Sequence, residues 1–435
     1  MRGLVKSLLL APVVVTVLLA SCGGPRVVTE PPPEAEPPME PLAPSMLDQA
    51  PSVRVLILER KKSVRMSISS EFYLCEDLAE APLKRFQDGG DFRVRFSNGG
   101  LELSEGGKAV HRAYLISIRT VSDASVYING KPYRGDMVFR PVDGGLITIN
   151  VLKIDDYIKG VLPAEIGYLG PNQYEAYRAQ AIASRSYALS KLPEKSGEIY
   201  DLRATIMDQV YKGKHGEHPE ASRAVDETRG IVAIWQKEPI KAYYCSCCGG
   251  HTADIRVSWP WKTPYPYLYG VRDASGDGGG RSFCRGSKNF RWSERWSGQE
   301  LRKVLKENIP EVTGAKPSAV GNIKDLKVTG ISDDGRIKAL EVVTDRHTFL
   351  IEGDKVRWVL RPAHKSGAIL RSTLFKLNTV KSGGKVQTVT VKGGGNGHGV
   401  GLCQSGAIRM AESGYTAEEI IEHYYPGTQI CKYYK

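Results

Sequence analysis

One carboxylate in this sequence has neighbours suited to acid–base chemistry. Glu165 ends the run Val161-Leu162-Pro163-Ala164-Glu165, and Ile166 follows it. Apolar surroundings disfavour the charged form of a carboxyl group and so raise its pKa. A carboxyl group with a pKa near the working pH can donate a proton and later accept one. The stretch therefore favours a general acid/base just ahead of a helix, although a lone glutamate there is more commonly a surface or helix-entry charge.

A second stretch has the residue types of a metal site. Cys245-Ser246-Cys247-Cys248-Gly249-Gly250-His251 follows the strand-like residues 240–244. Strand alternation would place Cys245 and Cys247 on one face and Cys248 on the other, and the two glycines permit a turn that returns His251 to them. Thiolate and imidazole are ligands of tetrahedral zinc, so these four residues predict a zinc site. A disulfide using Cys284 or Cys403, or buried thiols acting as small apolar groups, are the alternatives.

The cysteine count bears on that choice. The chain has eight cysteines, and Cys22 ends the sequence Leu19-Ala20-Ser21-Cys22, which resembles a bacterial lipobox. The apolar run before it is shorter than the roughly 20 residues of a membrane-spanning helix and has the form of a secretory signal. We therefore expect a lipoprotein signal at 1–21 and a lipidated Cys22, with an ordinary signal peptide as the alternative. An odd number of cysteines then remains, and they cannot all pair within one chain.

The elements that must position these residues fall into three parts. Residues 22–51 are proline-rich and cannot bury a core, which predicts an extended tether. Residues 52–132 alternate short apolar stretches with turn signals and read as β-rich. Residues 133–435 mix helical and strand patterns, including a helix over 174–192. The pattern predicts an α+β protein: a β-rich N-terminal part and a mixed catalytic core, with two lobes around a cleft.

Net charge limits the partners. The formal charge is +12 at pH 7, and no nucleic-acid-binding motif is present. A basic protein outside the membrane meets anionic lipid headgroups and wall polymers. We therefore expect no nucleic-acid partner.

Several sequence blocks together resemble the stage II sporulation protein D family, and they occur in that family's order. The matching blocks are residues 155–165, 179–189, 208–213, 249–252, 397–401 with Gln404, Gly406 and Ala407, and 423–427. They extend over roughly residues 133–428. Several ordered blocks are far more specific than any single one.

The resemblance implies a peptidoglycan lytic transglycosylase. Such enzymes cleave between N-acetylmuramic acid and N-acetylglucosamine without water and leave a 1,6-anhydro sugar. Ordinary glycosidases use two carboxylates. In a lytic transglycosylase the C6 hydroxyl of the sugar can act as the internal nucleophile, so one carboxyl group can suffice. The family's catalytic glutamate matches Glu165, and some relatives carry zinc near the block that contains His251.

The same resemblance suggests substrate-binding residues. Arg185 matches a family arginine and could hold a carboxylate or sugar, although an internal salt bridge is equally consistent. Gln209 and Tyr211 could bond to and stack on sugars, or be polar groups of the core. His398 lies between glycines that would leave it exposed to a flat glycan, and Gln404 belongs to the same final block.

Two departures from the family bear on the biological role. Cys403 stands where the family usually has serine, and the chain resembles a lipoprotein, whereas sporulation members are held by a transmembrane segment. We therefore expect an extracytoplasmic, membrane-anchored enzyme whose partners are peptidoglycan strands, membrane lipid through Cys22 and a cell-wall amidase. A non-catalytic wall-binding stimulator of such an amidase is the main alternative. A zinc hydrolase is disfavoured because the chain lacks an H-E-x-x-H motif.

Overall fold

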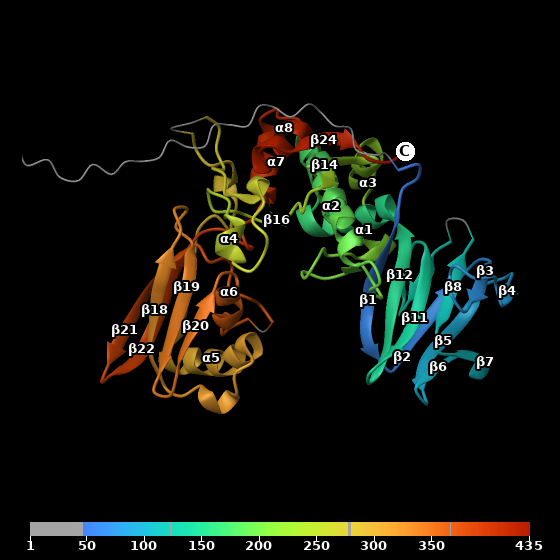
Figure 1. Ribbon diagram of the computed structural model, residues 1–435, viewed down its shortest axis with the longest axis horizontal. Helices are drawn as coiled ribbons and strands as arrows, with labels where there is room; N and C mark the ends of the chain where they lie inside the picture. The colour runs from blue at the N-terminus through green and yellow to red at the C-terminus, as the bar shows by residue number, and fades with distance from the viewer. Residues whose placement is uncertain (1–46, 122–123, 277–279, 366) are drawn as a thin grey trace, which may run out of the picture. The chain divides into compact units, whose positions relative to one another are not determined.

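The computed structural model describes residues 47–121, 124–276, 280–365 and 367–435 (Figure 1). The expected signal, Cys22 and all but the end of the expected tether lie outside the described residues. Among the helices that the structure describes, none is long and apolar enough to cross a bilayer.

Two sheets make up the N-terminal part. Apolar and polar residues alternate along their strands. In β2, for example, Val64, Met66 and Ile68 are buried and face one core. The first sheet has the order β13-β1-β12-β11-β8-β3-β4 and the second β10-β9-β2-β5-β6-β7. Their strands are β1 (Ser52–Lys61), β2 (Ser63–Ile68), β3 (Phe72–Cys75), β4 (Lys84–Phe86), β5 (Gly90–Ser97), β6 (Gly100–Glu105), β7 (Lys108–Ala113), β8 (Ile116–Thr120), β9 (Val126–Ile128), β10 (Lys131–Tyr133), β11 (Asp136–Val142), β12 (Gly145–Lys153) and β13 (Leu202–Arg203).

The first sheet continues past the boundary expected at residue 132. β12 pairs antiparallel with β1 along most of its length, and β11 pairs with β8 and β12. The β-rich part and the helical part therefore share one core, in which the end of β12 leads directly into α1.

A buried helix organises the helical part. α2 (Tyr174–Glu194) has small or apolar residues on all sides and is buried along most of its length, as expected for a helix inside a core. α1, α3, α7 and α8 lie around it (Figure 1). Besides α2, the elements of this part are α1 (Ile154–Ile166), α3 (Pro219–Glu227), α4 (Ile255–Ser258), α7 (Gln404–Glu412), α8 (Ala417–Tyr424), β14 (Ile231–Trp235), β15 (Glu238–Pro239), β16 (Tyr244–Cys245), β23 (Leu402–Cys403) and β24 (Gln429–Lys432).

Residues 292–391 contain a second core that the sequence pattern does not separate from the first. Its buried side chains, including Trp296, Leu305 and Leu340, form their own cluster between two three-stranded sheets and α5. We call this segment the inserted lobe. Its elements are β17 (Trp292–Ser297), α5 (Gly298–Thr313), β18 (Ile323–Ile331), β19 (Ile337–Thr344), β20 (Thr348–Glu352), α6 (Lys355–Val359), β21 (Phe375–Ser382) and β22 (Lys385–Gly393). Separate helices and mainly antiparallel sheets confirm the α+β class.

Candidate active site

Glu165 lies in the last turn of α1 and, as expected, ahead of the next helix, α2. The helix contains Pro163, and Gly167 ends it with a positive φ of 86° while its N–H donates to the carbonyl of Pro163. Residues 167–173 then turn the chain into α2. The Glu165 side chain is half-buried, and one carboxylate oxygen accepts a hydrogen bond of 2.6 Å from the backbone N–H of Val210.

Burial sets the pKa of this carboxyl group. It raises the pKa of Glu165 from 4.5 to about 7, against the opposing effect of hydrogen bonds from the Val210 N–H and the Tyr244 hydroxyl. Both protonation states are therefore populated near neutral pH. Such a group can protonate a leaving oxygen and then accept a proton within one cycle.

A buried chain of hydrogen bonds holds Tyr244 in place. The Gln209 side-chain amide donates to the Tyr244 hydroxyl (3.0 Å) and to the carbonyl of Ser184 (3.3 Å). The Gln209 carbonyl oxygen accepts from the hydroxyl of Tyr157 (3.2 Å). Because the Tyr244 oxygen accepts from Gln209, its own proton is free to point at Glu165. Gln209 is fully buried and positions Tyr244. It is therefore a polar group of the core and not the sugar contact that was the other expectation.

Tyr211 is also internal. Its hydroxyl donates to Asn150 (2.8 Å), and its ring packs 5.1 Å from that of Tyr157. Gly160 of α1 lies against this ring so closely that an added Cβ would approach it to 2.5 Å. The ring therefore fixes the position of α1 and is not available to stack on a sugar.

Arg185 forms the internal salt bridge that was the alternative to substrate binding. Its guanidinium is fully buried, pairs with Asp155 at 2.9 Å, and donates to the carbonyls of Ile231 (3.0 Å) and Val225 (3.1 Å). Asp155 also accepts from the hydroxyl of Tyr434 (2.8 Å). A side chain enclosed in this way cannot reach a glycan.

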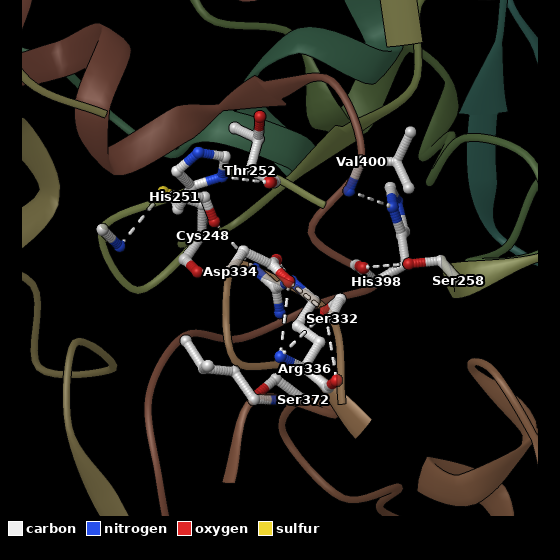
Figure 2. Close-up of polar contacts among 12 residues, drawn as sticks. Cys248, His251, Thr252, Ser258, Ser332, Asp334, Arg336, Ser372, His398 and Val400 are labelled. Atoms are coloured by element: carbon white, nitrogen blue, oxygen red, sulfur yellow. Dashed lines mark hydrogen bonds and ion pairs between the residues drawn. The ribbon is translucent and has the colours of Figure 1, made fainter. Parts of the chain in front are cut away.

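His398 is less exposed than its flanking glycines suggest. Its Nδ1 accepts from the N–H of Val400 (3.1 Å), its ring lies 4.7 Å from that of Trp259, and its carbonyl accepts from the hydroxyl of Ser258 (Figure 2). Burial lowers its pKa to about 4, so the imidazole is neutral at pH 7.

Gly399 leaves space for a side chain of the inserted lobe. An added Cβ there would lie 2.6 Å from the guanidinium of Arg336, which is fully buried. Figure 2 shows Arg336 beside Asp334, its ion-pair partner at 2.8 Å, and near Cys248 and His251, whose carbonyls accept from it. The glycine-rich block therefore brings the lobe and the main core together.

Gln404 completes the set of expected substrate contacts, and it is buried too. It begins α7 and donates to Gln180 of α2 (3.4 Å). The side chains exposed on the segments that flank Glu165 and lead to Val210 are different ones: Tyr168 (75% exposed), Ile206 (69%) and Met207 (64%). Their exposure depends on chain turns that residue type alone does not reveal, and they are the better candidates for glycan contacts.

The cysteines gather in a set that differs from the expected quartet. The ligand atoms of Cys248, Asp273, Cys284 and Cys403 all lie within 4.8 Å of one another, and all four residues are buried. His251 is outside this set, and its Nδ1 bonds to the carbonyl of Thr252 (2.7 Å). Cys245 pairs with Cys403 along β16 and β23 but is not part of the set either. The described cysteines are all free thiols.

Comparisons with known proteins add two domain matches. The model of a family described as "Stage II sporulation protein" matches residues 142–235, which include Glu165, Gln209 and Val210. A domain of unknown function matches residues 282–401, which contain the inserted lobe.

Curated relatives match over longer stretches. An uncharacterized protein of Brachyspira hyodysenteriae is 31% identical over 307 residues, covering 70% of this chain and 74% of the relative. An amidase enhancer of Bacillus subtilis is 26% identical over 398 residues, covering 85% of this chain and 52% of the relative, so the chain spans about half of that protein's length. Stage II sporulation protein D of Bacillus subtilis is 27% identical over 304 residues, covering 66% and 76%.

Proposed function

The chain belongs to the stage II sporulation protein D family, and from this premise we propose that it is a peptidoglycan lytic transglycosylase with Glu165 as its single acid/base. A role related to the cell wall is supported by the family and by the similarity to an amidase enhancer. The observation that carries the finer proposal is the Glu165 carboxyl group, whose pKa burial raises to about 7 within the family-matched segment.

The proposed reaction needs one proton-transfer group. Glu165 gives its proton to the glycosidic oxygen as the bond from that oxygen to C1 of N-acetylmuramic acid breaks. The C6 hydroxyl of the same sugar then bonds to C1, and its proton returns to the Glu165 carboxylate. The products are a new 4-hydroxyl group on N-acetylglucosamine and a 1,6-anhydro ring. No water is consumed, and the acid is regenerated.

The surroundings of Glu165 fit a mechanism with one carboxyl group. Its pKa is raised by burial and not by a neighbouring carboxylate. The nearby Asp208 has both oxygens engaged, one accepting from the Tyr187 hydroxyl (2.9 Å) and the other from the Arg203 N–H (2.9 Å). That pattern supports a structural role for Asp208 and leaves Glu165 to transfer the proton.

The products test this proposal directly. The purified chain is incubated with intact and with peptide-stripped peptidoglycan, and the soluble fragments are analysed by mass spectrometry. We expect fragments with 1,6-anhydro-N-acetylmuramic acid ends, which are lighter by one water than hydrolysis products. Ordinary reducing ends would mean hydrolysis and would overturn the proposal.

A second candidate is a non-catalytic stimulator of a cell-wall amidase, favoured by the relative that is named an amidase enhancer. In this case the chain would release no anhydro fragments by itself. It would raise the rate at which an added amidase removes stem peptides, and Glu165→Gln would stimulate equally well. Comparing both readouts on one peptidoglycan preparation separates the two candidates.

The proposed location is extracytoplasmic and anchored to the membrane through a lipidated Cys22. The lipobox-like sequence and the proline-rich residues 22–51 support it. A tether of that composition would let the catalytic part search polymer strands beyond the lipid surface.

Tyr244→Phe should move the pH dependence of cleavage. The acid form of Glu165 is required, so activity should fall as the pH rises through about 7. The Tyr244 hydroxyl stabilises the carboxylate and lowers this pKa. Its removal should therefore raise the pKa and shift the alkaline limb of the kcat/KM profile to higher pH.

Tyr243→Phe is the matched control, because that neighbouring hydroxyl accepts from Lys262 and lies outside the Gln209 network. We expect its alkaline limb to coincide with that of the wild type. A Tyr244→Phe profile that stays in place, or moves to lower pH, would contradict the assigned hydrogen bond.

A further inference from the structure

Four buried side chains from separate parts of the chain converge on one point. Cys248 follows β16, Asp273 lies in the connection after α4, Cys284 belongs to the short helical turn Phe283–Gly286, and Cys403 ends β23. Their three sulfurs and one carboxylate oxygen all lie within 4.8 Å of one another. Nothing in the acid–base chemistry of Glu165 uses them.

The spacing suits ligands of one ion better than a disulfide. The sulfurs of Cys248 and Cys284 are 3.7 Å apart, far beyond the roughly 2.0 Å of a disulfide bond. A tetrahedral zinc ion with bonds of about 2.3 Å to sulfur holds two sulfurs about 3.8 Å apart. Sulfurs at this contact spacing leave room for a single ion and not for a multi-iron cluster.

The backbone is arranged to favour metal-binding thiolates. The N–H of Cys248 donates to the sulfur of Cys403 (3.2 Å), and the N–H of Gly250 donates to the sulfur of Cys248 (3.4 Å). Gly249 and Gly250 have φ values of 81° and 118°, which only glycine adopts readily. The loop can therefore wrap around its own sulfur and direct N–H groups at it.

The carboxylate is held in orientation as well. One oxygen of Asp273 accepts from the N–H of Cys284 (2.9 Å), and the other accepts from the hydroxyl of Tyr424 (2.6 Å). Partners of this kind fix ligating carboxylates in metal sites. Three thiolates and one carboxylate supply the four ligands that a tetrahedral structural zinc ion requires.

We propose that Cys248, Asp273, Cys284 and Cys403 bind one zinc ion that joins the inserted lobe to the main core. Cys284 lies just before the lobe and Cys403 just after it, so the ion fixes both places where the chain crosses between them. Cys248 belongs to the main core, and its carbonyl accepts from Arg336 of the lobe (2.7 Å). The inference is independent of the glycan chemistry.

This ligand set shares only Cys248 with the quartet expected from sequence. Cys247 is buried and its thiol hydrogen-bonds with those of Cys284 and Cys403, but it does not belong to the set of four. His251 faces Thr252, and Cys245 lies in β16. A closed shell of four protein ligands leaves no position for substrate, so the ion has a structural role.

Metal analysis of the full chain tests the proposal. Protein is purified without chelator from zinc-supplemented cells, and its zinc content is measured by inductively coupled plasma mass spectrometry. We expect one zinc per chain, and less than a tenth of that in folded Cys284→Ser and Cys403→Ser. Cys75→Ser is the matched control, because Cys75 is a buried thiol in β3, far from the cluster in sequence, and should keep one zinc.

Two further measurements decide the result if the serine variants do not fold. Cobalt replacement in the wild type should give intense tetrahedral d–d bands and sulfur-to-cobalt charge-transfer absorption. Asp273→Asn should weaken zinc affinity roughly 10-fold or more, whereas Cys247→Ser should leave the stoichiometry at one. A folded wild type without zinc or cobalt signal, a Cys248–Cys284 disulfide in non-reducing peptide maps, or unchanged zinc in the cysteine variants would overturn the proposal. A zinc loss in Cys247→Ser together with unchanged zinc affinity in Asp273→Asn would overturn the proposed ligand set as well.

Discussion

Glu165→Gln is expected to reduce the release of anhydro fragments by roughly 100-fold or more. The amide keeps the size of the side chain and an oxygen that can accept from the Val210 N–H, but it has no proton to give to the glycosidic oxygen. Initial rates on peptide-stripped glycan strands at pH 6 to 7 measure the loss. Because the change removes transition-state stabilisation, kcat should fall while KM stays within a few-fold.

The same substitution should make the fold more stable at alkaline pH. Burial raises the pKa of Glu165 from 4.5 to about 7, so the folded state prefers the protonated form. The stability that this preference contributes is complete below pH 4.5 and is lost as the pH rises through about 7. Above that pH, the buried charge costs the wild type at most roughly 3 kcal/mol. Glutamine removes this cost, and urea unfolding at pH 5 and pH 8 should show the advantage only at pH 8.

Asp156→Asn provides the matched control for the cleavage measurement. Asp156 is on the same helix and is more exposed, near Lys159. We expect cleavage within about two-fold of the wild type. Full activity in Glu165→Gln would show that this glutamate is not the acid. A parallel loss in Asp156→Asn would show that α1 is sensitive to any lost charge.

The periodicity of apolar residues predicted individual helices and strands, but not which strands pair with one another. The helix expected over 174–192 is α2, which extends only two residues further, to Glu194. The inserted lobe was not separated because its strands alternate with the same period as those of the N-terminal sheets. Period-two alternation identifies a strand but not the sheet it joins. The order β17-β22-β21 joins segments about 90 residues apart, and only the folded chain shows this.

In the candidate active site, too, features set by neighbouring residues could be predicted, and features set by distant residues could not. The setting of Glu165 could be predicted because its apolar neighbours adjoin it in the sequence. The expected substrate contacts could not be assigned in this way, because their partners are distant: Gln209 bonds to Tyr157, and Gln404 bonds to Gln180. Residue type identified polar side chains in family blocks, but burial decides whether such a side chain meets substrate or the core. Likewise, Cys284 and Cys403 come from segments far from the Cys245–Cys248 stretch.

The largest stability effect should come from Arg185. From sequence, this residue could bind substrate or form an internal salt bridge, and the two roles predict different effects of its substitution. Arg185→Met should lower the free energy of unfolding by roughly 3–5 kcal/mol, because the buried carboxylate of Asp155 loses its close partner and keeps only the longer contact of 4.0 Å with the exposed Arg229. Arg178→Met, on the same helix, removes a partly exposed ion pair with Glu175 and a longer one, of 3.9 Å, with Glu418. That change should cost less than about 1 kcal/mol. Urea unfolding followed by circular dichroism gives both values.

A double variant separates the lost salt bridge from lost packing. Asp155→Asn combined with Arg185→Met removes both charges, so it should be more stable than Arg185→Met alone. The carbonyls of Val225 and Ile231 lose the hydrogen bonds from Arg185 in either case, so recovery should be partial. Arg185→Lys should also unfold at lower urea, because one ammonium group cannot reproduce the directed contacts of the guanidinium. If Arg185→Lys instead kept wild-type stability and bound peptidoglycan more weakly, the side chain would have a substrate-binding role and the buried pair would not be its main function.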